Sequence, residues 1–467
     1  MPDTGSRTGP LGAESRNPVT GDLIERFAFT DEAAMEAVLD ASDWAFSSWR
    51  ETRAADRAAV LARFAAVLRD RQETLAAIIT AEMGKTLAEA RGEVAKCATV
   101  AAWYAEHGVA LLVDEAAPVD EAEAYVSYLP TGVILAIMPW NFPLWQALRA
   151  AVPILMGGNG FLLKPAPNVM RCSLMLQQAW EQAGPPEGLF AVINADNDTV
   201  ARIIGDRRIS GVTLTGSPRA GAAIAALAGR ALKRSVLELG GSDPFIVLAD
   251  ADLDAAVAAG IRARYGNCGQ VCIAAKRFLL EAPIAQAFTE RFVEAARALV
   301  VGDPMRPETL MGPMARHDLR AELHGQVRAS IDQGARCLLG GLVPDGPGNF
   351  YAPTVLDQVG PGMVAFEAET FGPVAAISIV RDAEHAVALA NASEFGLSGN
   401  LWTADLERAR GLARRLQTGG VFINGFTASD PRVPIGGVRR SGYGRELSHF
   451  GIREFQNAQT VWVRHAS

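Results

Sequence analysis

The chain has 467 residues, of which 49% are hydrophobic and 21% charged, and it carries a formal net charge of −8 with a pI near 5.5. This length predicts about two or three domains, and the composition is that of a globular protein. The acidic balance excludes a nucleic-acid or anionic-membrane partner, and no apolar run reaches the ~18 residues of a membrane helix. Five cysteines without framework spacing, and the lack of a signal-peptide pattern, predict a cytoplasmic protein.

The first quarter of the chain is predicted to be a helical scaffold that follows a loose tail over residues 1–16. A helix is expected to begin at 30–32, where an oxygen-bearing capping residue is followed by acidic residues. Apolar residues recur at helical spacing over 52–83, Gly84 interrupts the pattern, and 85–107 resumes it. No catalytic constellation occurs in this part of the chain.

Short apolar strands then alternate with helices. The expected strands are 124–129, 133–138, 161–163, 189–193, 211–214, 235–239, 244–248 and 277–280, and the expected helices are 144–156, 169–183, 199–204, 253–264 and 285–300. This alternation predicts an α/β fold with parallel, doubly wound sheets, divided into two layers near Gly240. Ligands of such sheets bind beyond the carboxyl ends of the strands.

Polar residues follow several of these strands. Asn141 is a candidate oxyanion donor, although asparagine in a proline-rich turn is commonly structural. Gly216 and Ser217 could bind a phosphate on free N–H groups, with helix capping by Ser217 as the alternative. Glu238 is the only acid in its strand, so it either pairs with a buried cation or has the raised pKa of a general base. Lys164 is a ligand contact or a surface lysine.

Cys268 and Cys272 lie in a glycine-bearing segment, 265–274, that precedes an apolar strand. A nucleophilic thiol, a redox or metal pair, and two packed core thiols are all compatible with this spacing. The backbone N–H of Cys272 could also face a developing oxyanion. No metal site is predicted, because no second cysteine pair occurs and no acid or cysteine completes a set with His317 and His324.

Further motifs give these residues a common context. They are Asn17-Pro-Val-Thr-Gly21, Glu82-Met-Gly-Lys85, Pro139-Trp-Asn-Phe-Pro143, Lys164-Pro165, Thr215-Gly-Ser217, Glu238-Leu-Gly-Gly241, Gly269-Gln-Val-Cys272, Glu369-Thr-Phe-Gly-Pro373 and Pro434-Ile-Gly-Gly437. In this order they resemble the aldehyde dehydrogenase superfamily over nearly the whole chain. Segments 240–245 and 441–451 resemble the bacterial succinate-semialdehyde dehydrogenases that act with NAD or NADP.

The resemblance implies a particular domain organisation. A Rossmann-type NAD(P)-binding domain would comprise 1–118 and 133–239, and an α/β catalytic domain would comprise 240–435. A small β oligomerisation arm would comprise 119–132 and 445–467, which implies a homodimer or homotetramer.

The resemblance also implies roles for single residues. Cys272 would attack an aldehyde carbonyl, Asn141 would hold the oxyanion, and Glu238 would activate the water that releases a carboxylic acid from a thioester. The residues implied to bind the NAD or NADP cofactor are Trp140, Lys164, Gly216, Ser217, Glu369 and Phe371.

One departure from the family pattern concerns the cofactor. Relatives that prefer NAD usually carry a glutamate three residues after the lysine, where it binds ribose hydroxyls, and this chain has Pro167 there. An uncharged residue does not repel a 2′-phosphate, which predicts use of both NAD and NADP.

A second departure concerns the substrate. Arg149 occupies the position at which relatives bind the distal carboxylate of succinate semialdehyde, and a bidentate arginine suits that group. The second arginine that some of them carry is replaced by Gly266. Ser429 is expected to add a hydrogen bond, and Arg264 or Arg432 to supply the missing charge.

Other functions remain open from the sequence. The same chemistry could act on glutarate semialdehyde or an aliphatic aldehyde. The chain could be a non-catalytic relative, which the joint presence of Cys272, Glu238, Asn141 and Lys164 disfavours. It could also be a redox-sensing thiol protein that uses Cys268 with Cys272.

Overall fold

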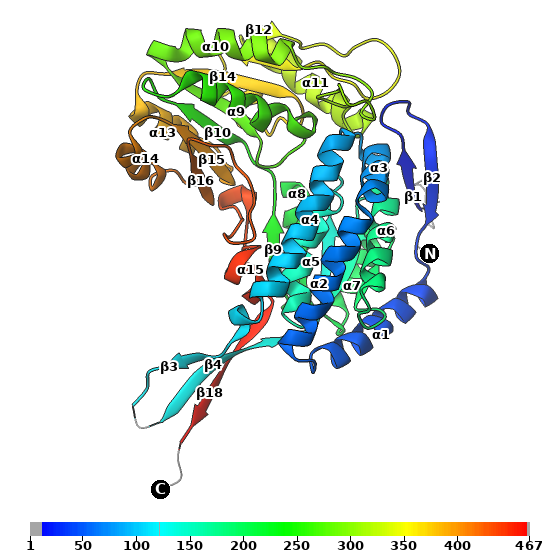
Figure 1. Ribbon diagram of the computed structural model, residues 1–467. Helices are drawn as coiled ribbons and strands as arrows, with labels where there is room; N and C mark the ends of the chain where they lie inside the picture. The colour runs from blue at the N-terminus through cyan, green and yellow to red at the C-terminus, as the bar shows by residue number, and fades with distance from the viewer. Residues whose placement is uncertain (1–11, 121, 465–467) are drawn as a thin grey trace, which may run out of the picture.

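The computed structural model describes residues 12–120 and 122–464. Two α/β lobes lie one above the other, and a narrow three-stranded sheet projects from them (Figure 1). Residues 1–11 of the predicted tail lie outside the described residues. The prediction of a loose tail is wrong for residues 12–16, because they form β1 (Gly12–Arg16), which pairs antiparallel with β2 (Leu23–Ala28).

The first lobe, lower in Figure 1, is built around a six-stranded sheet. Its strands, in spatial order, are β17 (Gly442–Tyr443), β9 (Arg234–Glu238), β8 (Ile209–Thr215), β5 (Val133–Met138), β6 (Gly160–Pro165) and β7 (Phe190–Val192). All neighbours are parallel except β17, which runs antiparallel to β9. Because β8 and β6 flank β5, the chain order reverses at β5. The loop that follows β5 therefore opens into the crevice where such sheets bind ligands.

The helices of this lobe cover both faces of the sheet. They are α1 (Glu32–Trp49), α2 (Ala54–Asp70), α3 (Gln72–Met83), α4 (Leu87–His107), α5 (Trp145–Met156), α6 (Met170–Gln182), α7 (Asn197–Gly205), α8 (Pro218–Arg230) and the short α15 (Ser448–Arg453). The segment 52–83 thus forms two helices rather than one, with Arg71 at the junction. Gly84 ends α3 as predicted, because its φ of +90° is disfavoured for any residue with a Cβ.

The continuous apolar run of β5 is explained by burial on both faces of the sheet. Ile134, Ala136 and Met138 pack on one face in a core shared with α2 to α6. Val133 and Leu135 pack on the other face with residues of α1, α7 and α8. A strand covered on both sides needs apolar side chains at successive positions, so the predicted parallel, doubly wound sheet is confirmed.

The second lobe, upper in Figure 1, is built around a seven-stranded sheet. Its strands, in spatial order, are β12 (Arg336–Leu339), β13 (Thr354–Asp357), β14 (Val374–Val380), β11 (Ala275–Glu281), β10 (Asp243–Val247), β15 (Ser398–Trp402) and β16 (Gly420–Ile423). Its helices are α9 (Leu253–Tyr265), α10 (Ala282–Arg297), α11 (His317–Asp332), α12 (Val364–Glu367), α13 (Ala383–Asn391) and α14 (Leu406–Ala413). Only the β12–β13 pair of this sheet is antiparallel.

The projecting sheet has the order β18 (Gln456–Val463), β4 (Glu123–Pro130), β3 (Glu115–Ala117), and both pairs are antiparallel. Residues 115–117 belong to this sheet, so the sheet begins earlier in the chain than residue 119, where the arm was predicted to begin. Among the described residues, no helix is both long and apolar enough to span a membrane.

A buried ion pair anchors α5, the helix that follows the loop after β5. Lys85 Nζ lies 2.6 Å from Glu93 Oε2, and both side chains are fully buried. The other oxygen of Glu93 accepts the backbone N–H groups of Leu144 and Trp145, each at 2.9 Å. The Glu93 carboxylate thus satisfies donors at the start of α5, where helices have N–H groups without an intrahelical partner.

We expect Glu93→Ala to lower the apparent free energy of unfolding by about 3–5 kcal/mol, because it leaves the Lys85 ammonium buried without a partner. Urea titration followed by circular dichroism measures this loss. The control is Glu73→Ala, which removes an exposed pair with Arg91 and should leave the unfolding midpoint unchanged. A loss below about 1 kcal/mol for Glu93→Ala would contradict the anchoring role.

Candidate active site

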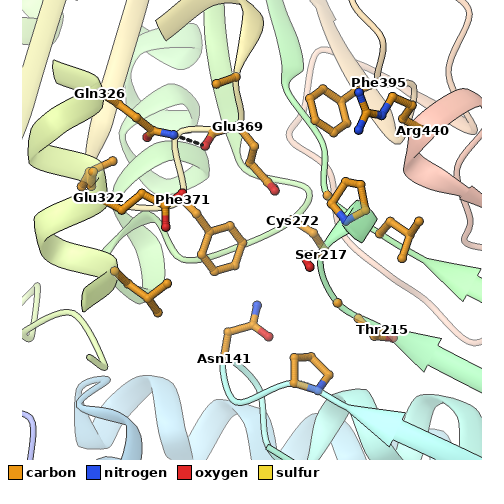
Figure 2. Close-up of a pocket in the computed structure, with 18 of the residues that line it drawn as sticks. Asn141, Thr215, Ser217, Cys272, Glu322, Gln326, Glu369, Phe371, Phe395 and Arg440 are labelled. Carbon is orange, nitrogen blue, oxygen red and sulfur yellow. Dashed lines mark hydrogen bonds between the residues drawn. The ribbon is translucent and has the colours of Figure 1, made fainter. Parts of the chain in front are cut away.

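Two cavities meet at Cys272. The first encloses about 490 Å³ between the lobes, and Figure 2 shows Asn141, Ser217, Glu369 and Phe371 around it together with Cys272. The second encloses about 320 Å³, and it too is lined by Cys272. A thiol at this junction can face one ligand from each side. The structure thus brings together residues that lie far apart in the sequence.

The loop that carries Cys272 is held in an unusual backbone conformation. After α9, the residues Asn267, Cys268 and Gly269 all have positive φ. A side chain at Gly269 would approach the Gly372 carbonyl oxygen to 2.3 Å, so only glycine fits there. Arg264 holds the same loop, because its Nη2 donates to the carbonyls of Gly269 at 2.7 Å and Gly372 at 2.6 Å. The prediction that Arg264 supplies charge to a substrate is therefore wrong.

Asn141 is fixed next to this loop. Its side-chain Nδ2 donates to the Gln270 carbonyl at 2.9 Å, and its backbone carbonyl accepts from Asn267 Nδ2 at 2.9 Å. A carboxamide nitrogen carries two hydrogens, so one donor remains after the bond to Gln270. Asn141 lines the first cavity, where the predicted oxyanion donor is needed.

Cys272 is partly exposed, and its backbone is bound by a lysine that sequence reasoning missed. Lys276 Nζ donates to the Cys272 carbonyl at 2.7 Å and to the Val271 carbonyl at 3.0 Å. Burial raises the pKa of the Cys272 thiol to about 11, while the positive charges of Arg149 and Lys276 act in the opposite direction. The signal for Lys276 is a lysine inside an apolar strand immediately after the cysteine.

A buried charge cluster lies behind the thiol. Arg149 Nε bonds Glu446, Arg149 Nη2 lies 3.6 Å from Glu238 Oε2, and the same nitrogen is 3.4 Å from Thr215 Oγ1. Arg149 lines the second cavity, yet its guanidinium already contacts two carboxylates. Its predicted substrate role is therefore not supported by this geometry. Glu446 was missed, although it lies in the segment 441–451 that carried the family resemblance.

Glu238 has the raised pKa that a general base requires. Burial, opposed by the Arg149 guanidinium and aided by the charge of Glu446, raises the pKa of its carboxyl to about 7. Glu238 Oε1 has no hydrogen-bond partner among the described residues. Glu238 is not among the residues that line either cavity, so its carboxylate lies behind the wall in this structure. The sequence left two alternatives for Glu238, a pair with a buried cation and a raised pKa. The structure has both.

The first cavity also contains a helix N-terminus. Ser217 caps α8 by accepting the Ala220 N–H at 3.3 Å, and Gly216 N–H donates to the Glu238 carbonyl at 3.0 Å. Gly216 and Ser217 both line the cavity. The free N–H groups and the dipole of a helix N-terminus favour a phosphate. Capping and anion binding are therefore compatible at this position.

Aromatic and acidic residues line the rest of the first cavity. Trp140 and Phe371 meet edge to face with ring centroids 5.8 Å apart. Glu369 Oε1 accepts the Gly241 N–H at 3.0 Å and lies 3.4 Å from Lys276 Nζ. Apolar ring surfaces, a carboxylate and a phosphate-binding helix end together fit a dinucleotide.

Lys164 lies apart from these residues. It ends β6 and lines a different cavity of about 740 Å³ with Pro167 and Asn168. Burial lowers the pKa of its amine. The structure therefore does not bring Lys164 to the cavity that contains Cys272.

Neither Cys268 nor Arg432 lines either of the two cavities that meet at Cys272. Cys268 is buried in the core of the second lobe, and burial raises the pKa of its thiol, which disfavours a reactive redox sensor. Arg432 pairs with Asp430 and is not among the residues that line the second cavity, so the prediction that it supplies substrate charge is wrong. Among the described residues, no group of three or more His, Cys, Asp and Glu side chains could hold a metal ion.

Comparison with known proteins shows which family the chain matches. A profile of the Aldehyde dehydrogenase family matches residues 7–461. The chain is 57% identical over 450 residues to the NAD(P)+ succinate semialdehyde dehydrogenase Sad of Escherichia coli, covering 96% of this chain and 97% of that protein. It is 46% identical over 450 residues to NADP+ succinate-semialdehyde dehydrogenase 1 of Mycobacterium tuberculosis, covering 96% of this chain and 98% of that protein.

A solved structure agrees with these sequence matches. The succinic semialdehyde dehydrogenase of Streptococcus pyogenes, in complex with NADP+ as the cofactor, superposes with a TM-score of 0.95 at 35% identity. The alignment covers 97% of this chain and all of that one. The chain therefore belongs to the aldehyde dehydrogenase family, and the predicted family and fold class are confirmed.

We expect iodoacetamide to alkylate Cys272 in the native protein and to leave buried cysteines such as Cys268 unmodified. Because the pKa of Cys272 is about 11, the thiolate fraction and the alkylation rate should rise about tenfold per pH unit between pH 7 and 9. Mass spectrometry of peptides after timed quenching measures this rate. A rate that is constant above pH 7 would show that the thiol is already ionised and would contradict the burial argument.

Proposed function

We propose that this protein oxidises succinate semialdehyde to succinate with NAD or NADP, through covalent intermediates on Cys272. The observation that carries the proposal is the position of Cys272 at the junction of two cavities, the first with a lining that suits a dinucleotide and the second lined in part by Lys96, Arg149 and Arg262. Relatives that are 57% and 46% identical over nearly the whole chain are named for this reaction.

In the first step the Cys272 thiolate attacks the aldehyde carbon. The pKa of the free thiol is high, so the nearby positive charges of Arg149 and Lys276 must help to stabilise the thiolate. The carbonyl oxygen becomes an alkoxide in the resulting thiohemiacetal. The remaining hydrogen of the Asn141 amide and the Cys272 N–H are the donors that can stabilise it.

A nicotinamide held in the first cavity would supply the hydride acceptor, and loss of hydride from the adduct would leave Cys272 carrying a thioester. Glu238 then removes a proton from the water that attacks the thioester carbon, and the acid leaves as the thiolate is restored. A pKa of about 7 lets Glu238 accept this proton near neutral pH. Its carboxylate must turn from Arg149 toward the thioester to do so, because it lies behind the cavity wall.

The cofactor would be held by residues of the first cavity. The N-terminus of α8 at Gly216 and Ser217 would bind the pyrophosphate, while Trp140, Glu369 and Phe371 would surround the nicotinamide half. Lys164 would contact the adenosine ribose from a third cavity, which it lines together with Pro167. The uncharged Pro167 leaves room for either a ribose hydroxyl or a 2′-phosphate, in agreement with relatives named for NAD(P)+ and NADP+.

The three-stranded sheet would act as an oligomerisation arm in a homodimer or homotetramer. Its outer strands β3 and β18 each have one edge without a partner strand among the described residues. Trp462 and Val463 on β18 are exposed. Apolar side chains on an open strand edge favour pairing with another chain.

Spectrophotometric assay of NADH and NADPH formation tests the proposed function. We expect succinate semialdehyde to be oxidised with a higher kcat/KM than butanal or glutarate semialdehyde. The kcat/KM values with NAD+ and NADP+ should lie within about a thousandfold of each other. Cys272→Ala should abolish turnover of every aldehyde, because no thioester can form.

Matched controls identify the alternatives. Cys268→Ser should retain wild-type activity, because Cys268 is buried away from both cavities. A higher kcat/KM for butanal than for succinate semialdehyde would overturn the substrate assignment. Undiminished turnover in Cys272→Ala would overturn the mechanism.

A further inference from the structure

The second cavity presents three cationic side chains in addition to Cys272. They are Lys96, Arg149 and Arg262. A substrate with a carboxylate remote from its aldehyde needs a cation whose charge and donors are still available. The three side chains differ sharply in this respect.

Arg149 is already committed to protein carboxylates. It bonds Glu446, lies 3.6 Å from Glu238, and is only 2% exposed. The guanidinium charge is already shared between these two protein carboxylates, so little of it is available to a further anion. Arg149 therefore acts on the electrostatics of Glu238 rather than as a free anion site.

Arg262 is exposed at the rim of the cavity. Its guanidinium carbon lies 5.5 Å from the centroid of the Phe426 ring. Solvent screens a charge in such a position, so its contribution to binding a small anion is weak.

Lys96 is partly buried and has no carboxylate partner among the described residues. The charges of Glu93 and Asp430 act on Lys96, but each of these acids is already paired, Glu93 with Lys85 and Asp430 with Arg432. Lys96 Nζ instead donates to Ser429 Oγ at 2.6 Å and lies 4.1 Å from the centroid of a tryptophan ring on α5. An ammonium has three donors, so two remain after the bond to Ser429.

We propose that Lys96, assisted by Ser429, is the specificity-determining residue that binds the distal carboxylate of the substrate. This inference rests on the proposed function, since it assumes an aldehyde that bears a carboxylate. Lys96 takes the place of the second arginine expected at Gly266, although it comes from α4, on the opposite lobe. The hydroxyl of Ser429 can accept from Lys96 and donate its own hydrogen to the same carboxylate.

The protonation state of Lys96 agrees with this role. Burial lowers its pKa to about 8, with the Arg149 charge acting in the same direction. The amine is still mainly protonated at pH 7, and a bound carboxylate would favour the charged form further. The tryptophan ring beneath it stabilises the ammonium without neutralising it.

Steady-state kinetics of Lys96→Met, with succinate semialdehyde and butanal as substrates, tests the inference. We expect kcat/KM for succinate semialdehyde to fall about 100-fold, mainly through KM, as loss of charge-assisted hydrogen bonds predicts. The value for butanal should change less than about threefold, because butanal has no carboxylate. Lys96→Arg should recover most of the loss.

A binding measurement and a matched lysine control complete the test. Isothermal titration of the wild-type protein with succinate should give saturable binding that Lys96→Met weakens about 100-fold. Lys233→Met alters another partly buried lysine, which is absent from both cavities, and should leave both substrates and succinate binding unchanged.

Each outcome assigns the failure to one hypothesis. Equal losses for both aldehydes in Lys96→Met, or unchanged kinetics with both, would overturn the Lys96 assignment while the proposed function stands. A wild-type enzyme that does not prefer succinate semialdehyde over butanal would overturn the proposed function itself.

Discussion

The active site depends on one buried guanidinium. Arg149, on α5, contacts Glu446 from the C-terminal segment and Glu238 at the end of β9. Burial raises the pKa of Glu238 to about 7, and the Arg149 guanidinium keeps it from rising further. The same guanidinium stabilises the Cys272 thiolate. Arg149 thus lowers the pKa of both the proposed nucleophile and the proposed base. Its removal would leave two buried carboxylates without their cation.

The two lobes contribute different parts of this site. The first lobe supplies strand ends and a helix N-terminus, which provide fixed N–H and amide donors at the crevice of a parallel sheet. The second lobe supplies the strained cysteine loop, held by Arg264 and Lys276. This loop fixes the position of the Cys272 thiol, whose own pKa is raised rather than low. Substrate selection then falls to the Lys96–Ser429 pair, which joins α4 of the first lobe to the segment after β16 of the second.

The sequence predicts features that depend on local patterns. The apolar run of β5, the loop with Asn141 and the glycine-bearing turn before Cys272 were all located correctly, because each is determined by neighbouring residues. Pairings between distant segments were missed. Arg149 meets Glu446 across 297 residues, and Lys96 meets Ser429 across 333. Periodicity and spacing carry no information on such contacts, so the cationic residues were assigned to the wrong partners.

The division of labour between Cys272 and Glu238 is tested most directly by the variant Glu238→Gln. With saturating NAD+ and succinate semialdehyde, we expect a burst of about one NADH per active site, followed by steady-state turnover reduced about 10²–10⁴-fold. Peptide mass spectrometry of the quenched protein should find a succinyl group on Cys272. A steady-state rate close to that of the wild-type enzyme, or a burst without an acyl group on Cys272, would contradict the division of the reaction between this thiol and this carboxylate.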